Sequence, residues 1–299
     1  MLHVWRASGE EVASRPKGEI SNVRALKLWL QKLTGYGRFR QRLLVDVVSL
    51  EDEAELKEIS DFQLVLLPFA ETTRQQVEEL ASAASQGLLA EVEAALHRPQ
   101  DPDLDQTQRL SPLAAAAAGG HDEVVRMLLE AAADKDKVSG PKGCTALALA
   151  CESGHAQTVH LLLEARADKN KVRRLRRSTP LALASQNGKL EVVHLLLSAN
   201  GVVDVDTPLC AAAAEGNASI VGLLLESRAN KDVVDQRDSH RPLGVASAGG
   251  HAAVVQALLE ARADLEVQDA GFGDTPLCLA SRLGRVDVMR LLLESGAAG

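Results

Sequence analysis

Three histidines are the first residues whose type and spacing could do chemistry. His121, His155 and His251 each directly follow a glycine, at equivalent places of a repeating pattern. An imidazole can ligate zinc, but zinc needs its ligand atoms about 2 Å away. Stacked repeats are separated by about one helix diameter, roughly 10 Å. We therefore predict turn or helix-start residues here, and no metal site.

The four cysteines, Cys144, Cys151, Cys210 and Cys278, show no metal spacing such as CxxC. No histidine or carboxylate accompanies them in a nucleophile pattern. Cys210 and Cys278 share one repeat position, two repeats apart, so they cannot meet. Free cysteine packs as a small hydrophobe. We predict small core residues, with reduced thiols typical of a cytoplasmic protein, or alternatively a nuclear one.

Catalytic motifs are missing from the sequence. It contains no GxxxxGK, no GxGxxG after a strand and no GxSxG. Glutamates recur at the ends of predicted helices, where we expect solvated edges: Glu130, Glu164, Glu226, Glu260 and Glu294. These observations predict a protein that is not an enzyme and needs no cofactor.

The most basic segment is DKNKVRRLRRS, which holds six Lys and Arg residues between positions 169 and 177. Three interpretations are open: a solvated turn, a site for an acidic partner, and a nuclear-import or nucleic-acid patch. The whole chain has 33 Lys and Arg against 41 Asp and Glu, a net charge of −8. The segment would therefore be a local positive spot, and we expect no nucleic-acid partner.

Composition divides the chain of 299 residues. Hydrophobic residues make up 46% and charged residues 25%, a globular mixture. No apolar run approaches the roughly 18 residues of a membrane span, and acidic residues come too early in the chain for a signal peptide. Aromatic residues are only 2%, and all but Phe272 precede residue 70. We predict a boundary there, with domains 1–70 and 71–299.

The second domain repeats one pattern. A Ser, Thr or equivalent residue stands at 111, 145, 179, 207, 241 and 275, at spacings of 34, 34, 28, 34 and 34 residues, and a worn copy starts near 78. Proline usually follows, at the first helical turn. A short Ala-rich helix then ends at a glycine, and a second, Leu-rich helix follows. Neither helix could bury its apolar side alone, so we expect the units to stack.

These units resemble the ankyrin repeat, a β-turn with two antiparallel helices and a T-P-L-H-x-A signature. The resemblance covers about residues 77–299. It implies an α-solenoid of about seven helix-turn-helix repeats. The His of the signature is replaced in this chain by Ala114, Ala148, Ala182, Cys210, Gly244 and Cys278. The 28-residue spacing lacks six residues of the turn, which predicts one stunted finger.

The first domain has a different pattern of hydrophobic and polar residues from the repeats. Residues 2–6 and 11–14 indicate strands, residues 22–33 an amphipathic helix that stops at Gly35, and RLLVDVV and FQLVLL two further strands. The order β-β-α-β-β resembles ubiquitin-like domains over residues 1–67 and implies a small α+β (β-grasp) domain. The resemblance places Leu44 and Val65 in the family's apolar docking patch, whose third member is Ser8 here. The diglycine tail is absent, so a conjugated tag is not expected.

The ankyrin resemblance implies that finger tips and the exposed side of the first helices bind a partner. Mapped position by position, the partner-binding residues are Lys142, Glu152, Arg176, Gln186, Asn187, Arg237, His240, Phe272, Asp274, Arg282 and Leu283. We predict a non-enzymatic interaction scaffold or adaptor for another protein. The alternative is a ubiquitin-pathway adaptor, whose head docks a proteasome or ligase component while the repeats hold a client.

The last helix pair has no polar capping unit after it, and terminal repeats normally need a polar outer face. Val286, Met289 and Leu293 would leave an apolar end. We expect self-association through this end, or a further segment beyond it.

Overall fold

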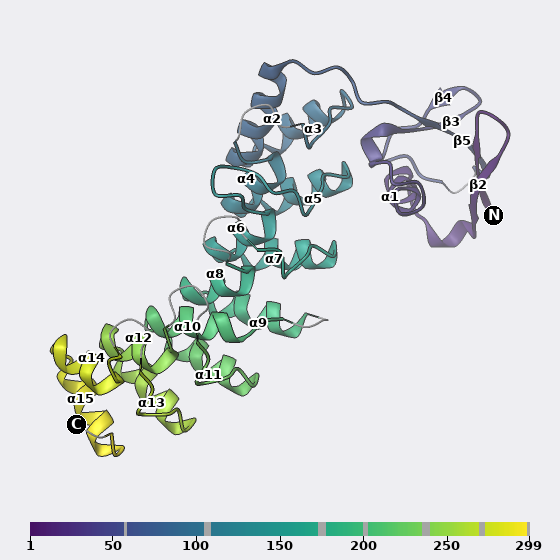
Figure 1. Cartoon of the computed structure of the whole chain (residues 1–299). Coiled ribbons are helices and arrows are strands. Elements are labelled where there is room, and N and C mark those ends of the chain that lie inside the picture. Colours follow the sequence, from purple (N-terminus) through teal and green to yellow (C-terminus); the bar gives the residue numbers. More distant parts are fainter. Residues whose placement is uncertain are drawn as a thin grey trace. The chain divides into compact units, whose positions relative to one another are not determined.

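The computed structural model describes residues 1–56, 59–104, 109–172, 178–199, 203–234, 240–268 and 273–297. The chain forms two compact units, residues 1–141 and residues 142–299. The first unit contains a small sheet domain and two helix pairs, and the second contains helix pairs alone (Figure 1). Among the described residues, no helix is long and apolar enough to cross a bilayer.

The sheet domain, called the head below, has five strands in the order β2-β1-β5-β3-β4. The strands are β1 (Leu2–Arg6), β2 (Glu11–Arg15), β3 (Gln41–Val45), β4 (Val48–Ser49) and β5 (Asp61–Leu66). Strand β1 pairs with β5 in parallel, and the other pairings are antiparallel. The expected β-β-α-β-β order is observed, but the predicted strand RLLVDVV was too long. Strand β3 ends at Val45, and Asp46 and Val47, both with positive φ, turn the chain into the two-residue strand β4.

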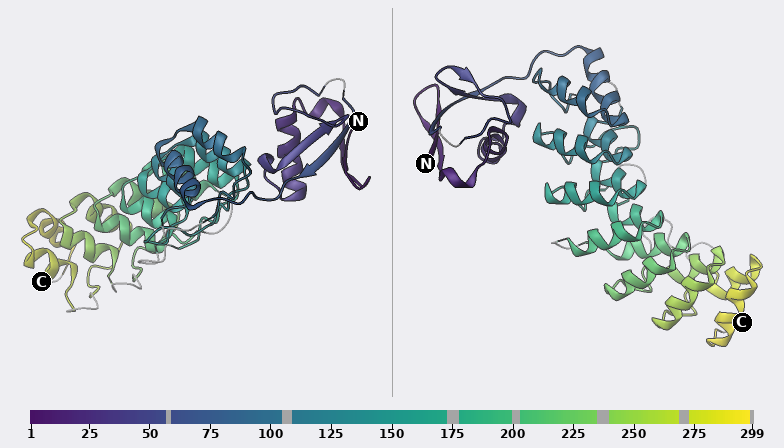
Figure 2. Two further views of the ribbon diagram at one scale, coloured as in Figure 1. Left: turned by 90° about the horizontal axis from the view of Figure 1, so that it is seen from above. Right: turned by 180° about the vertical axis from the view of Figure 1, so that it is seen from behind.

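Helix α1 (Val23–Thr34) covers one face of this sheet (Figure 2). It begins where the Asn22 side chain accepts a hydrogen bond from the Ala25 amide, and it ends at Gly35, whose φ of 75° is left-handed. Its apolar stripe, with Leu26 and Leu30, packs against the inward side chains of the strands, Phe62 among them. This cluster is the core of the head.

The first unit continues with two helix pairs. They are α2 (Arg74–Gln86) with α3 (Leu89–Leu96), and α4 (Pro112–Gly119) with α5 (Asp122–Glu130). Helix α2 packs against α4, and α3 against α5, so the two pairs stack. Helix α2 starts with a capping box, in which the Thr73 and Gln76 side chains satisfy each other's backbone amides.

The second unit is a stack of helix pairs (Figure 1). The described helices are α6 (Ala146–Ser153), α7 (Ala156–Glu164), α8 (Pro180–Gln186), α9 (Leu190–Ser198), α10 (Asp206–Ala214), α11 (Ala218–Glu226), α12 (Pro242–Gly249), α13 (Ala252–Glu260), α14 (Pro276–Arg282) and α15 (Val286–Glu294). The even-numbered helices pack on one another in a row, and the odd-numbered helices form a second row. We call these the first and second helices of each repeat.

The start of most first helices follows the same rule. A Ser or Thr side chain accepts a hydrogen bond from the backbone amide three residues later. This cap is formed by Ser111, Thr145, Thr179 and Thr275. In the described structure, neither Val205 at the start of α10 nor Arg241 at the start of α12 makes such a cap.

A side-chain hydrogen bond joins successive repeats at the turn between the two helices. His121 donates from Nε2 to the Ser85 carbonyl, and His251 donates to the Ala214 carbonyl, each at 3.0 Å. Asn217 and Arg285 donate at the equivalent positions. The histidines are helix-start residues, as predicted. They also supply hydrogen bonds between repeats, which the sequence pattern did not predict.

The shortened connection of the 28-residue repeat lies between α9 and α10. Lys169 donates from Nζ to the Ala199 carbonyl at 2.8 Å. The Asp206 carboxylate accepts from the backbone amide of Asn230 at 2.7 Å, and the Asp232 carboxylate accepts from the backbone amide of Asp264 in the next repeat. A pocket of about 850 Å³ lies between the ends of α7 and α9. The tip of the predicted stunted finger, residues 200–202, lies outside the described residues.

Candidate partner-binding surface

Three of the predicted partner-binding residues, Arg176, Arg237 and Phe272, lie outside the described residues. Residues 173–177 of the basic segment lie outside them as well. Among the described residues, Lys142 is exposed before α6, and Glu152 is partly buried on α6.

Two more predicted residues end helix α8. Gln186 donates from Nε2 to the Glu215 carboxylate at 3.4 Å, next to α10. Asn187 uses its amide nitrogen to cap its own helix, at 2.8 Å from the Leu183 carbonyl. Gln186 is therefore held by the neighbouring repeat, and Asn187 by its own.

The remaining four predicted residues gather at α12 and α14. Arg282 forms an ion pair with Asp274 at 2.9 Å. A pocket of about 260 Å³ opens between the two first helices. Its lining residues are His240, Arg241, Gly244, Val245, Ala248, Leu279, Arg282 and Leu283. The structure thus brings His240, Arg282 and Leu283 together, with Asp274 beside them.

The lining of this α12–α14 pocket consists of apolar or small residues and of basic residues. The wall and floor are apolar or small, and the polar lining residues are His240, Arg241 and Arg282. None of the described lining residues is acidic. Arg241 donates from Nη1 to the Asp232 carbonyl at 2.7 Å, which holds its side chain in place. Arg241 and Gly244 were not predicted as site residues, although both break the pattern of the repeat.

A family model described as ankyrin repeats in three copies matches residues 80–173, 168–235 and 209–298. The chain belongs to the ankyrin repeat family. A solved structure similar to it is the human ASB11 ankyrin repeat domain, at 29% identity and a TM-score of 0.65. That match covers 74% of this chain and 98% of the other. The comparison with curated proteins gives no match.

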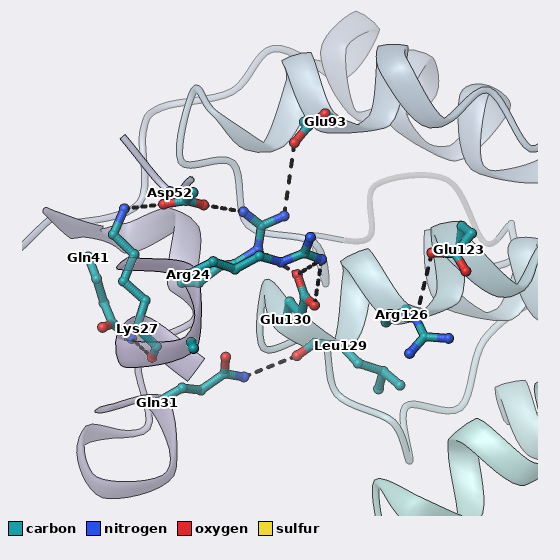
Figure 3. A network of polar contacts seen from close by, with 12 residues as sticks. Arg24, Lys27, Gln31, Gln41, Asp52, Glu93, Glu123, Arg126, Leu129 and Glu130 are labelled. Atoms are coloured by element: carbon teal, nitrogen blue, oxygen red, sulfur yellow. Dashed lines mark hydrogen bonds and ion pairs between the residues drawn. The ribbon is translucent and has the colours of Figure 1, made fainter. Parts of the chain in front are cut away.

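In the first unit, the head contacts the first ankyrin repeats through buried charges (Figure 3). Arg38 donates from Nε to Glu130 at 2.5 Å and from Nη1 to Asp52. Arg24 donates to Glu130 at 2.8 Å, and Lys27 donates to Asp52 at 2.5 Å. We call these five residues the junction network. The prediction that Glu130 is a solvated helix edge was wrong, because the head covers it and leaves it 9% exposed.

The junction network favours the ionised form of the Asp52 carboxylate. Burial alone would raise the pKa of Asp52. The hydrogen bond from Lys27 and the charges of Lys27 and Arg38 outweigh burial, so the pKa is lowered. Close packing surrounds the network. A Cβ at Gly37 would lie 2.4 Å from the Ala131 backbone, so only glycine fits there.

The two predicted docking residues of the head lie on the sheet face opposite α1. Leu44 pairs with Gln63 and Val65 with Arg42, and these pairs alternate with the inward Leu43 and Leu64 pair. Leu44 and Val65 are partly buried, and Ser8 is exposed in a turn. The side chains of Leu44 and Val65 are therefore diagonal neighbours on one face.

Cysteine burial follows the position of each repeat. Cys144, Cys151 and Cys210 are buried, but Cys278 is exposed. The prediction that Cys278 is a core residue was wrong. Helix α12 covers α10, whereas no described first helix packs on the far side of α14. Burial also raises the pKa of the Cys151 thiol. The described residues contain no group of three metal-ligating side chains.

Proposed function

We propose that this protein is a non-enzymatic scaffold or adaptor that binds another protein through the finger tips and first-helix side of its ankyrin repeats. Ankyrin repeats generally mediate protein–protein interaction, and the family match covers most of the chain. The observation that carries the proposal is the α12–α14 pocket, which unites His240, Arg282 and Leu283 on the first-helix side. The proposed setting is the cytoplasm, because the four cysteines are free thiols.

The proposed domains are residues 1–70 and 71–299, with seven repeats anchored near 78, 111, 145, 179, 207, 241 and 275. Helix caps and inter-repeat hydrogen bonds hold the described first helices in fixed positions. A surface that is already ordered loses little conformational entropy on binding. This favours recognition over catalysis.

The test is affinity capture with the full chain, followed by binding measurements with the purified partner. Alanine at Arg176, Phe272 and Arg282 should remove partners that the wild type retains. A matched control carries alanine at Gln157, Glu226 and Arg290, which are exposed residues of second helices. Equal retention by both variants would contradict the proposal.

The second candidate is a ubiquitin-pathway adaptor, with the head as a ubiquitin-like (β-grasp) domain. The mixed sheet, the helix across one face, and the position of Leu44 and Val65 on the other face favour it. Titration of the full chain with a ubiquitin-receptor domain of the proteasome tests it. Binding that Leu44→Ala abolishes supports this candidate, and the absence of binding rejects it.

Self-association through the last repeat is also proposed. Val286 is 64% exposed and Leu293 is 54% exposed, so α15 presents apolar side chains. Light scattering at high protein concentration should show a dimer that Leu293→Glu disrupts. A monomer at every concentration would argue against this contact.

A further inference from the structure

Helix α12 differs in residue type from the other repeats at two positions. The first departure is at its start. The other repeats have Ser or Thr at the position of Arg241. In the described structure α12, like α10, starts without a side-chain cap. Loss of an N-cap destabilises a helix. The guanidinium is instead held over the α12–α14 pocket by its bond to the Asp232 carbonyl.

The second departure is Gly244, inside the helix. The other repeats have an alanine or cysteine at this position: Ala114, Ala148, Ala182, Cys210 and Cys278. Glycine within a helix is less stable than alanine. Packing does not require it here. Among the described atoms, a Cβ at Gly244 would meet only Leu279 Cδ1, at 3.6 Å, an ordinary contact.

Both departures weaken the helix, and both residues line the same pocket. The missing methyl group at Gly244 deepens the floor beside Val245 and Leu279. The arginine replaces a neutral hydroxyl at the rim with a positive charge. The volume, about 260 Å³, is below the range of about 300–1,000 Å³ that is typical of small-molecule sites. A pocket of this size suits one side chain of a larger partner.

We propose that the α12–α14 pocket receives an apolar side chain from an extended segment of a partner protein, and that acidic residues flank this side chain. The apolar floor, Val245, Ala248 and Leu279, accepts the side chain. The rim cation Arg241 pairs with a flanking carboxylate, since arginine binds carboxylates with two parallel hydrogen bonds. Arg282 also lines the rim, where it is ion-paired with Asp274. This inference rests on the proposed function and names the chemistry of the partner at this site.

The test uses the full chain and fluorescein-labelled peptide pools, with fluorescence anisotropy as the readout. Each pool has a central leucine, and its flanking positions are either Asp and Glu, Asn and Gln, or Lys and Arg. A fourth pool is acidic but has glycine in the centre. The acidic leucine pool should bind about ten-fold more tightly than each of the others. Its affinity should fall as salt rises, because salt screens the rim charges.

The decisive variant is Arg241→Thr with Gly244→Ala, which gives α12 the residues of the other repeats. It should bind the acidic leucine pool about ten-fold more weakly, a typical effect of removing central contacts. Its melting temperature should not fall, because both changes favour the helix. Gly222→Ala on α11 is the matched control. No described atom lies within 4 Å of a Cβ there, so it should leave peptide binding unchanged.

The proposal is overturned if the wild type binds no pool, if the basic pool binds as well as the acidic one, or if the double variant binds as the wild type does. These outcomes are separate from the proposed function. A partner whose capture needs Arg176 and Phe272, but is unaffected by Arg241→Thr with Gly244→Ala, would still establish the scaffold.

Discussion

Arg38→Met is the most informative single change in the first unit, because Arg38 lies at the centre of the junction network and is 2% exposed. Its charge-assisted bonds to Glu130 and Asp52 are each worth about 1.5–3 kcal/mol. Asp52 keeps Lys27, and Glu130 keeps Arg24, so neither carboxylate is left unpaired. We therefore expect a loss of about 3 kcal/mol, at the lower end of the range for breaking buried pairs.

The assay is urea unfolding followed by tryptophan fluorescence. The chain has two tryptophans, Trp5 and Trp29, and both belong to the head. The signal therefore reports unfolding of the head. Arg24→Met is the matched control, since it removes the same charge from a side chain that is 37% exposed. It should cost about 0–1 kcal/mol, as exposed pairs do.

Two results would refute this reasoning. A loss below about 0.5 kcal/mol for Arg38→Met would mean that the buried pairs contribute little to stability. Equal losses for both variants would mean that burial does not distinguish the two arginines.

Three further predictions concern the core, acid stability and thiol reactivity. Leu196 is 0% exposed, so Leu196→Ala should cost about 2–5 kcal/mol in urea unfolding followed by circular dichroism; a change below about 0.5 kcal/mol would contradict its burial. The lowered pKa of Asp52 gives stability that is complete above its unfolded value of 3.8 and is lost as the pH falls below it. Acid titration of tryptophan fluorescence should show this loss, and Asp52→Asn should flatten it; an unchanged profile would refute the role of Asp52. A thiol reagent should label the exposed Cys278 alone in the folded protein, and Cys278→Ser should abolish labelling; rapid labelling of a second thiol would show that a buried cysteine is accessible.

The helix pairs were predictable because their start and stop signals are local. The Ser or Thr at the start of a helix caps the backbone amide three residues later. The glycine at the end adopts the left-handed conformation that stops the helix. Thr145 and Gly154 bound α6 in this way. The order of elements in the head followed from the same kind of local pattern, and only the two-residue strand β4 was too short to show.

The junction network was not predictable, because its members are far apart in the sequence. Arg24 and Glu130 are separated by 106 residues. A glutamate at a helix end is usually solvated, and no local signal distinguishes Glu130 from Glu164. The burial of Cys278 was predicted wrongly for a related reason. Its position in the repeat is buried only where another first helix packs over it.

The α12–α14 pocket is an intermediate case. Arg282 and Leu283 were found by mapping the repeat. Arg241 and Gly244 were visible as departures from the repeat. That they line one pocket depends on how α12 packs against α14, which the sequence does not give. Departures from an internal repeat are therefore worth examining for function when each one weakens the local element.

The side-chain bonds that join successive repeats have an evolutionary consequence. His121, Asn217, His251 and Arg285 differ in chemistry, yet each donates to a main-chain carbonyl of the preceding repeat. A carbonyl is supplied by every residue type, so the acceptor survives any substitution at its position. A duplicated or exchanged repeat can therefore form this hydrogen bond without a compensating mutation in the preceding repeat. Such an array can change its length and its recognition residues independently.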